Sequence, residues 1–189
     1  STATVGQYAP GSTFKVATAL ALVRSGLTPD SPVECTPTVT VDGREFRNFP
    51  GYPEGSVGTI PLREAIAQSC NTALIAQSAS ITSADVADAA AGLGIGAALP
   101  EGEAWPFPYF SGSVPTDATG TTHAADLIGQ GDVLASPLAM AGVAASVAAG
   151  RTVVPTLVEV EGAPVPVAPA VPLTAEEAQT LQELMYGVV

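Results

Sequence analysis

The sequence contains very few basic side chains. Its 189 residues hold six lysines and arginines together and one histidine, against 18 acidic residues, which gives a net charge of −12. Lys15 is the sole lysine and His123 the sole histidine. Nucleic-acid binding needs clustered Lys and Arg, so we expect no nucleic-acid partner. A reaction that needs a basic or cationic side chain must use one of these few residues.

Cysteines and strongly apolar runs are also scarce. The two cysteines, Cys35 and Cys70, are too few for a zinc site, which needs about four ligands. One disulfide and two buried thiols are both compatible with this number. The uncharged runs 65–84 and 133–150 are interrupted by polar residues or rich in alanine. A membrane span needs about 20 apolar residues, so both runs predict core helices, and we expect any membrane anchor outside this chain.

The chain is long enough for one domain or a large part of one, and 47% of its residues are hydrophobic. Ser12 or Thr13 can cap a helix that ends before Gly26. Alternating β-formers around Asp42-Gly43 predict a type I′ hairpin. Capping and periodicity signals predict five further helices. One runs over 59–69 with Pro61 in its first turn, a second starts at about 72, and a third runs over 84–91 with Ser83 as cap and Gly92 as its end. A fourth starts at Ser136-Pro137, and a fifth runs over 175–185 behind a Thr174/Glu177 capping box.

Proline, glycine and serine mark residues 96–120 as a long loop, and 151–160 reads as an extended segment. No run of long central strands appears. The predicted fold is therefore mostly α with a small β-hairpin.

Ser12 and Lys15 form an S-x-x-K pair. On a helix, residues three apart share one face, with Cβ atoms about 5–6 Å apart, so the hydroxyl and the amine can meet. Serine is a weak nucleophile until a base takes its proton, and lysine is a base only when its pKa falls toward neutrality. Desolvation and the positive end of the helix would both lower that pKa, and the helix end offers N–H groups to an oxyanion. The alternative is a surface serine with a solvated lysine, which the scarcity of lysine argues against.

Ser69-Cys70-Asn71 lies between two predicted short helices. A second hydroxyl near the amine can relay a proton to a leaving group, and the carboxamide can hold a substrate amide. The alternative is an interhelical turn in which serine and asparagine only cap helices.

Together these motifs resemble the first two signatures of the penicillin-binding proteins, whose superfamily carries S-x-x-K, S-x-N and K-T-G. Two further stretches are similar to the GQG…TPLQMA region of the high-molecular-mass enzymes: Ile128-Gly129-Gln130-Gly131 and Ser136-Pro137-Leu138-Ala139-Met140-Ala141. The resemblance runs from about residue 8 to 189. It implies the helical part of the α/β penicillin-binding/β-lactamase-like transpeptidase fold, with the central sheet largely missing.

The resemblance also implies roles for four residues. Ser12 would be the acylated nucleophile, Lys15 its general base, Ser69 the proton shuttle to the leaving amine, and Asn71 the ligand of the substrate amide. The acyl donor would be a peptidoglycan stem peptide ending in D-Ala-D-Ala, which is then cross-linked to an amine, and β-lactams would acylate the same serine. No metal and no organic cofactor is implied.

Neither K-T-G nor K-S-G occurs in the 189 residues. We therefore expect residues 1–189 to be a partial transpeptidase domain with negligible turnover by itself. The resemblance places it on the extracytoplasmic face of a bacterial membrane, anchored outside this chain, among cell-wall synthesis or division proteins.

Two other activities are compatible with an S-x-x-K serine. A D,D-carboxypeptidase or β-lactamase-like hydrolase would pass the acyl group to water, and a non-enzymatic β-lactam sensor would only retain it. Residues that suggest other chemistry are His123 with Asp126 or Asp132 as a triad, Glu101 and Glu103 as deacylating carboxylates, and the aromatic cluster Trp105, Phe107, Tyr109 and Phe110 as a wall of the cleft. For these we favour structural roles, because the expected motifs around them are missing.

Overall fold

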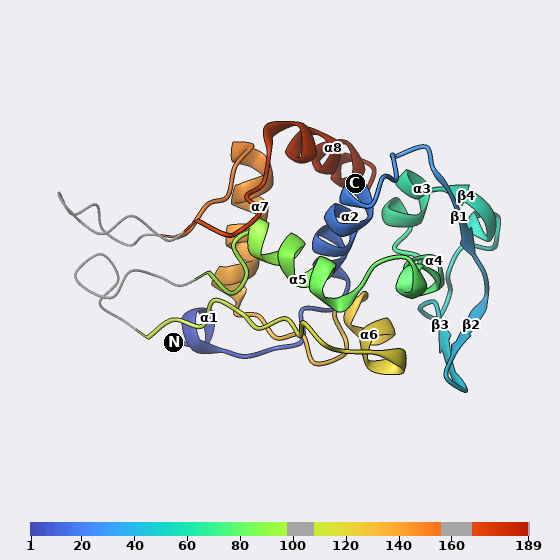
Figure 1. Cartoon of the computed structure of the whole chain (residues 1–189). Helices are drawn as coiled ribbons and strands as arrows, with labels where there is room; N and C mark the ends of the chain where they lie inside the picture. The colour runs from blue at the N-terminus through green and yellow to red at the C-terminus, as the bar shows by residue number, and fades with distance from the viewer. Residues whose placement is uncertain (98–107, 156–167, 189) are drawn as a thin grey trace.

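The computed structural model describes residues 1–97, 108–155 and 168–188. In this part of the chain helices surround a central helix α2 (Lys15–Arg24), and the strands lie together at one side of the molecule, beside α3 and α4 (Figure 1). The fold prediction, mostly α with a small hairpin, is confirmed for these residues.

Helix α2 is buried on almost every side. Six consecutive residues, 17–22, are buried, and small alanine side chains let α5 (Ser83–Gly92) and α8 (Ala175–Tyr186) pack closely against them. Leu27 N donates to Leu22 O and Gly26 N to Val23 O, both at 3.0 Å, with Gly26 at φ 106°. This is the predicted glycine-terminated helix end.

The predicted hairpin is present. Strand β2 (Thr38–Val41) pairs antiparallel with β3 (Arg44–Arg47), and Asp42 and Gly43 both have positive φ, at 46° and 80°, as a type I′ turn requires. A second antiparallel pair, β1 (Pro32–Cys35) with β4 (Gly58–Pro61), was not predicted. Each of the two strands has only four residues, one of which is proline, so the sequence pattern that would predict a strand is weak.

Helices α3 (Leu62–Ala67) and α4 (Asn71–Ile75) bracket Ser69-Cys70. Pro61 is the N-cap of α3 and the last residue of β4, so residues 59–61 of the helix predicted over 59–69 are strand and Pro61 lies just before the first turn. Cys70 forms a disulfide with Cys35 at the end of β1, which decides the question that the sequence left open. Cross-linking residues 35 apart stabilises a fold by roughly 3–4 kcal/mol on the chain-entropy estimate. The start of α4 is therefore tied covalently to the sheets.

The remaining helix boundaries follow the capping signals with some shifts. Helix α5 is capped by Thr82, in a capping box with Asp85, so the assignment of Ser83 as cap was wrong. Ser136 caps α7 (Pro137–Ala149) with Pro137 at its first position, and Thr174 caps α8 through the predicted box. Helices α1 (Thr2–Val5) and α6 (Gly120–Asp126) were not predicted. Short 3₁₀ turns are η1 (Gly11–Phe14), η2 (Glu54–Ser56) and η3 (Ala76–Ala79). Residues 98–107 of the predicted loop 96–120 and residues 156–160 of the predicted extended segment 151–160 lie outside the described ranges.

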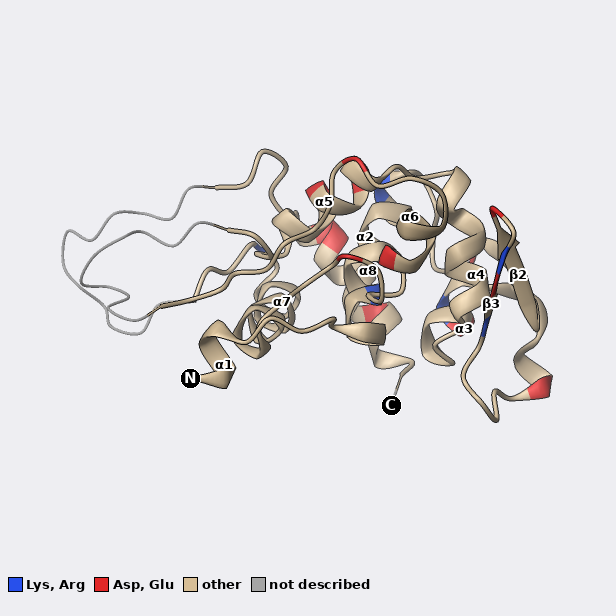
Figure 2. Ribbon diagram, turned by 90° about the horizontal axis from the view of Figure 1, so that it is seen from below, with Lys and Arg blue, Asp and Glu red and all other residues tan. Residues whose placement is uncertain are grey.

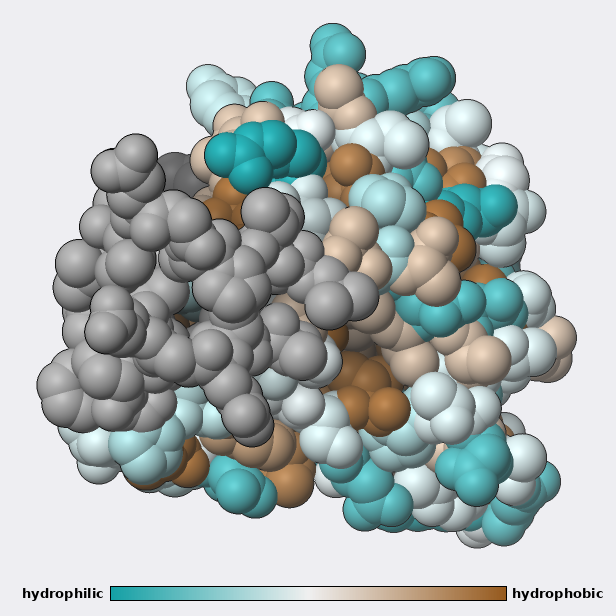
Figure 3. All heavy atoms as spheres, turned by 60° about the vertical axis from the view of Figure 1, so that its left-hand side comes forward, coloured by the Kyte–Doolittle hydropathy of each residue, from teal (hydrophilic) through white to brown (hydrophobic). Residues whose placement is uncertain are grey.

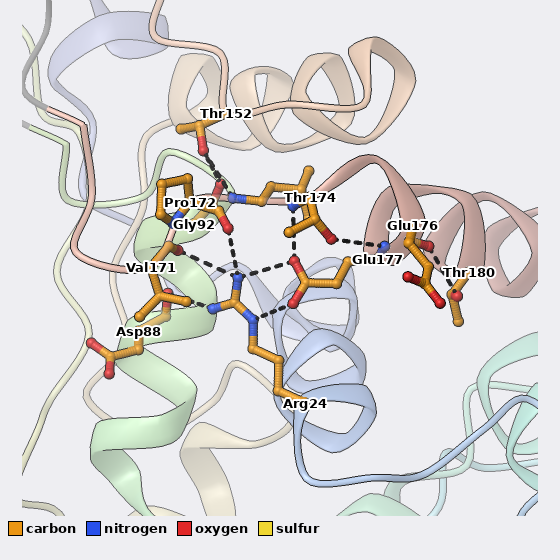
Figure 4. Close-up of polar contacts among 11 residues, drawn as sticks. Arg24, Asp88, Gly92, Thr152, Val171, Pro172, Thr174, Glu176, Glu177 and Thr180 are labelled. Atoms are coloured by element: carbon orange, nitrogen blue, oxygen red, sulfur yellow. Dashed lines mark hydrogen bonds and ion pairs between the residues drawn. The ribbon is translucent and has the colours of Figure 1, made fainter.

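Arg24, in the last turn of α2, forms hydrogen bonds with α5, with α8 and with the segment that precedes α8. Its Nε donates to Glu177 Oε1 of α8 at 2.8 Å, and its other nitrogens donate to the carbonyl oxygens of Asp88, Val171 and Pro172 (Figure 4). The pairing is largely shielded, because the two side chains are only 17% and 19% exposed. Desolvation raises the pKa of Glu177, but hydrogen bonds from Arg24 and Thr174 and the Arg24 charge outweigh it and leave that pKa below its ordinary value.

The charge distribution matches the acidic composition. Figure 2 shows acidic positions on several helices and basic positions at few places, one of which is strand β3. The face drawn in Figure 3 mixes hydrophilic and hydrophobic residues. None of the helices in the described ranges is long and apolar enough to cross a membrane.

Candidate active site

Ser12 lies in the 3₁₀ turn η1 that leads into α2, not in the first α-helical turn as predicted. Its side chain is exposed. Thr13 Oγ1 donates to Pro10 O at 2.7 Å, and neither Ser12 nor Thr13 caps the helix with its side chain, so that assignment was wrong. Residues three apart eclipse one another in a 3₁₀ turn, so Ser12 and Lys15 still share one side of the chain.

Residues 127–129 form hydrogen bonds with this turn and with the start of α2. Gly11 N donates to Gly129 O at 2.9 Å, and Thr18 Oγ1 of α2 donates to Leu127 O at 2.8 Å. Gly129 has φ +66°, and a Cβ there would lie 2.3 Å from Gly11 O. The Ile128-Gly129-Gln130-Gly131 stretch therefore packs backbone to backbone against the residue before Ser12.

Lys15 is only 3% exposed, and its amine is fully hydrogen-bonded. Nζ contacts Ser69 O at 2.7 Å, Ser69 Oγ at 2.9 Å and Asn71 Oδ1 at 2.7 Å. Burial lowers the pKa of Lys15 from 10.5 to about 8. With a pKa of about 8, about one tenth of this amine is neutral at pH 7, far more than at the ordinary pKa of 10.5.

Ser69 connects this amine to Ser12. Its Oγ lies 3.2 Å from Ser12 Oγ and 2.9 Å from Lys15 Nζ. The sequence predicted direct contact between Ser12 and Lys15, but all three hydrogen bonds of Nζ in the structure go to Ser69 and Asn71. The two hydroxyls and the amine form a chain in which Ser69 is the middle member.

Ser69 holds this position at a backbone cost. Its φ is +55°, in the left-handed region that non-glycine residues rarely occupy. It stands where a helix often ends with glycine: Ser69 N donates to Ile66 O at 3.0 Å and Cys70 N to Ala65 O at 2.7 Å, which closes α3. Such strain is common at functional sites.

Asn71 uses both ends of its carboxamide. Oδ1 accepts from Lys15 Nζ at 2.7 Å, and Nδ2 donates to the backbone carbonyl of Arg47 at 3.0 Å. These partners fix which end is oxygen, because a carbonyl can only accept. An amide nitrogen has two hydrogens, so one N–H of Asn71 remains for a ligand.

A pocket of about 520 Å³ opens at this cluster. Its polar end is formed by Ser12, Lys15 and Ser69, and its other wall is apolar, with contributions from Val16, Ile66, Met140, Val143, Ala144, Met185 and Val188. A substrate at Ser12 would therefore have polar groups on one side and the apolar faces of α7 and α8 on the other.

The other candidates do not join this cluster. His123 is buried on α6, and its Nε2 bonds to Ile81 O at 2.8 Å, so it is a helix residue and not the predicted loop residue. Asp126 Oδ1 accepts from Asp132 N at 2.7 Å. None of these three lines the pocket at Ser12. Glu101, Glu103, Trp105 and Phe107 lie outside the described residues, while Tyr109 and Phe110 lie inside them and do not line this pocket.

Sequence reasoning missed two contributors to the site. One is the backbone of β3, whose Arg47 carbonyl orients Asn71; no sequence pattern reports a carbonyl. The other is Asn48, whose side chain contacts the start of α4. Within the described ranges no group of three or more His, Cys, Asp or Glu could hold a metal ion.

These features define a serine–lysine site of the kind that begins with an S-x-x-K pair at the start of a buried helix. The family profile of the penicillin-binding protein transpeptidase domain matches residues 1–189, and the chain belongs to this family.

Particular relatives narrow the comparison. The chain is 36% identical over 147 residues to the peptidoglycan D,D-transpeptidase PbpA of Mycobacterium tuberculosis, covering 76% of this chain and 29% of that protein. It is 33% identical over 155 residues to PbpA of Mycolicibacterium smegmatis, covering 80% of this chain and 31% of that one. The chain thus spans about three tenths of the length of these curated relatives.

Solved structures of penicillin-binding proteins are similar to this chain in fold. The imipenem acyl-enzyme of penicillin-binding protein A from M. tuberculosis superposes with a TM-score of 0.75 and 29% identity, over 96% of this chain and 44% of that one. The penicillin-binding protein PBP2 of Helicobacter pylori matches with a TM-score of 0.78 over 98% of this chain and 36% of that one, at 20% identity, which shows a shared fold.

Proposed function

We propose that the protein containing this chain is a peptidoglycan D,D-transpeptidase that forms an acyl-enzyme on Ser12. One observation carries the proposal: the buried amine of the sole lysine lies 2.9 Å from Ser69 Oγ, which lies 3.2 Å from the exposed Ser12 Oγ. The PbpA relatives are named D,D-transpeptidases, and the solved M. tuberculosis homologue carries imipenem as an acyl group.

The contacts of Lys15 suggest the proton path. Ser69 O and Asn71 Oδ1 can only accept hydrogen bonds, so a neutral amine donates its two hydrogens to them. Its lone pair then faces Ser69 Oγ. In the structure Lys15 Nζ donates to Ser69 Oγ, and Ser69 Oγ donates to Ser12 Oγ. With the amine neutral both hydrogen bonds would reverse, so that Ser12 donates to Ser69 and Ser69 donates to Lys15. In this proposal Lys15 is the general base, and it acts on Ser12 through Ser69.

The chemical steps follow from this relay. Ser12 Oγ attacks the carbonyl carbon of the penultimate D-Ala, and its proton passes to Ser69 while the Ser69 proton passes to Lys15. Collapse of the tetrahedral intermediate breaks the peptide bond, and the amine of the terminal D-Ala takes a proton back along the same path. An amine from a neighbouring peptidoglycan strand then attacks the Ser12 ester and loses a proton to Lys15 through Ser69. The ester bond breaks, and the Ser12 oxygen takes that proton back along the same path, which restores the serine. All groups involved are side chains and substrate, so the proposal includes no cofactor.

Asn71 is the proposed ligand of the substrate amide. Its Oδ1 and one Nδ2 hydrogen are already engaged by Lys15 and Arg47 O, so the second Nδ2 hydrogen would donate to a substrate carbonyl. The fixed amide orientation means that Asn71 recognises an acceptor and not a donor.

Residues 1–189 are proposed to be part of a transpeptidase domain whose K-T-G or K-S-G strand lies elsewhere in the protein. The sequence has neither motif, and a missing oxyanion-hole donor alone costs about 3–4 kcal/mol of transition-state stabilisation. We accordingly propose negligible turnover by these residues alone. The site of action is the extracytoplasmic face of a bacterial membrane, with cell-wall assembly proteins as partners; the H. pylori PBP2 homologue has been solved in complex with MreC.

The test is acylation by a fluorescent penicillin, followed by peptide mapping with mass spectrometry. It uses the protein in a form that includes a K-T-G or K-S-G strand. The expected adduct is on Ser12, and it is absent from Ser12→Ala. A label on another residue, or no label on the native protein, overturns the proposal.

A second assay separates transfer from hydrolysis. D-Ala-D-Ala peptides are supplied with and without an amine acceptor, and cross-linked and hydrolysed products are counted. Predominant cross-linking is expected. A large hydrolytic excess would assign the protein to the D,D-carboxypeptidases or β-lactamase-like hydrolases, and a stable adduct without any product would indicate a sensor.

A further inference from the structure

Asn48 lies directly after strand β3, 23 positions before Asn71 in the chain, and its side chain meets the start of α4. Asn48 Oδ1 accepts from Asn71 N at 2.8 Å and from Thr72 N at 3.1 Å. Asn48 Nδ2 donates to Thr36 O at 3.1 Å, which fixes the orientation of the carboxamide. Asn48 is half-buried and does not line the pocket at Ser12.

Helix α4 needs this help because its own cap is weak. The N-cap residue is Cys70, whose sulfur lies 3.3 Å from Ala73 N, and this sulfur is bound in the disulfide with Cys35. Sulfur is a weak acceptor compared with the oxygens of Ser, Thr, Asn or Asp that usually fill this position. The first two N–H groups of the helix therefore depend on an oxygen from another element, and Asn48 supplies it.

We propose that Asn48 is a positioning residue of the active site, acting through Asn71; this inference rests on the function proposed above. Two adjacent residues hold Asn71: Asn48 binds its backbone N–H, and the Arg47 carbonyl binds its side-chain Nδ2. With both contacts made, Asn71 Oδ1 stands 2.7 Å from Lys15 Nζ. Asn48 thus sets the distance between the S-x-N turn and the S-x-x-K lysine.

The loss of Asn48 Oδ1 would leave two N–H groups without a strong acceptor and release the first turn of α4. Ser69 and Asn71 flank Cys70, so both acceptors of the Lys15 amine would move with that turn. A displacement of about 1 Å in a catalytic group can cost on the order of 100-fold in rate.

Three variants separate positioning from stability. Asn48→Leu removes the acceptor oxygen and keeps the bulk. Asn48→Asp keeps an acceptor oxygen for Asn71 N and Thr72 N, but replaces the Nδ2 donor to Thr36 O and Thr72 Oγ1 with a carboxylate oxygen. Thr72→Val is the matched control, because Thr72 Oγ1 donates to the same Thr36 carbonyl at 2.6 Å and its loss weakens the same region without removing an acceptor from Asn71 N.

The first measurement needs no enzymatic activity. Lys15 is the only lysine, so ¹⁵N-lysine labelling of the 189-residue chain gives one side-chain ammonium signal, observed well below the Lys15 pKa of about 8. In Asn48→Leu we expect Asn71 to move and its Oδ1 to lose the hydrogen bond from the Lys15 ammonium. Hydrogen exchange of this ammonium should then be at least about 10-fold faster, because a hydrogen bond to a charged group is lost. The exchange rate in Asn48→Asp and Thr72→Val should stay near that of the native chain.

The second measurement is the rate constant of Ser12 acylation by the fluorescent penicillin, at saturating concentration and in the form of the protein used above. We expect this rate constant to fall about 100-fold in Asn48→Leu. In Asn48→Asp it should stay within about 10-fold of the native value, and in Thr72→Val within about threefold.

Unchanged ammonium exchange in Asn48→Leu overturns the inference, as does equal loss of acylation in Asn48→Leu and Thr72→Val, which would make the effect one of stability. If the native protein is not acylated at all, the proposed function fails, and the ammonium signal still decides whether Asn48 positions Asn71.

Discussion

Lys15 has the most unusual environment of any single residue in the site. Its amine is buried and fully hydrogen-bonded, and burial lowers its pKa to about 8. An amine acts as a base only in its neutral form. The rate of Ser12 acylation should therefore rise about tenfold per pH unit below 8 and level off above it, when measured with a stable β-lactam across that range.

Lys15→Arg is the matched variant for this pH profile. A guanidinium retains its charge at every accessible pH, so acylation should be lost without recovery at high pH. A profile that is flat from pH 6 to 9, or an active Lys15→Arg protein, would remove Lys15 from the role of base.

Ser69 offers a test of strain against chemistry. Because its φ is +55°, Ser69→Gly relieves the backbone, whereas Ser69→Ala retains the strain, and both remove the hydroxyl. We expect Ser69→Gly to be about 1 kcal/mol more stable than Ser69→Ala in urea denaturation, while both lose acylation. Equal stability of the two variants would show that the left-handed backbone is not strained in solution.

At the scale of elements, the segment around Gly129 packs against the turn that holds Ser12. A methyl group at Gly129 would meet Gly11 O at 2.3 Å and Phe14 Cβ at 2.8 Å, and the residue also has φ +66°. We expect Gly129→Ala to lower both the stability and the rate of Ser12 acylation, because Gly11 must move and Ser12 follows it.

Gly26→Ala is the control for backbone conformation alone, because Gly26 also has positive φ, at 106°, but no atom within 4 Å of an added Cβ. It should cost about 1 kcal/mol in thermal or urea denaturation and leave the acylation rate unchanged. If Gly129→Ala behaves like Gly26→Ala in both assays, the close approach to Gly11 does not matter.

The elements differ in how far their sequence predicts them. Capping residues and the Asp42-Gly43 turn act on neighbours in the chain, so the ends of α7 and α8 and the β2–β3 hairpin follow from local signals. The β1–β4 pair joins segments far apart in sequence, and its strands of four residues carry little periodicity of their own. The 3₁₀ turn at Ser12 likewise depends on the hydrogen bond from Gly11 to Gly129, which no local pattern contains.

At the scale of the whole molecule, Arg24 of α2 contacts both α5 and α8, and its ion pair with Glu177 is partly buried (Figure 4). Arg24→Met removes the charged donor from Glu177, which keeps the hydrogen bond from Thr174 N, and from three carbonyl oxygens. We expect a loss of about 2 kcal/mol in unfolding free energy at neutral pH. Arg63→Met is the control. Arg63 pairs with Asp30 and Glu183 at the surface, where it is 44% exposed, so its loss should cost less than about 1 kcal/mol.

The same pair predicts a pH dependence. The folded-state pKa of Glu177 lies below its ordinary value of 4.5, so its contribution to stability is present above pH 4.5 and is lost as the pH falls through the lowered pKa. The stability difference between the native chain and Arg24→Met should therefore shrink as the solution is acidified. A difference that stays constant down to the acid transition would mean that the ion pair contributes nothing.

The sequence by itself determined the family resemblance and singled out the four candidate site residues, because spacing within S-x-x-K and S-x-N is local information. The sequence also determined where α7 and α8 start, because their capping residues are adjacent to them in the chain. Only the tertiary structure decided that Ser69 stands between Ser12 and Lys15, that Cys35 pairs with Cys70, and that Asn48 and the Arg47 carbonyl hold Asn71. These contacts join residues 23 to 57 positions apart. Their geometry depends on how the helices and hairpins pack, and no segment contains that arrangement within itself.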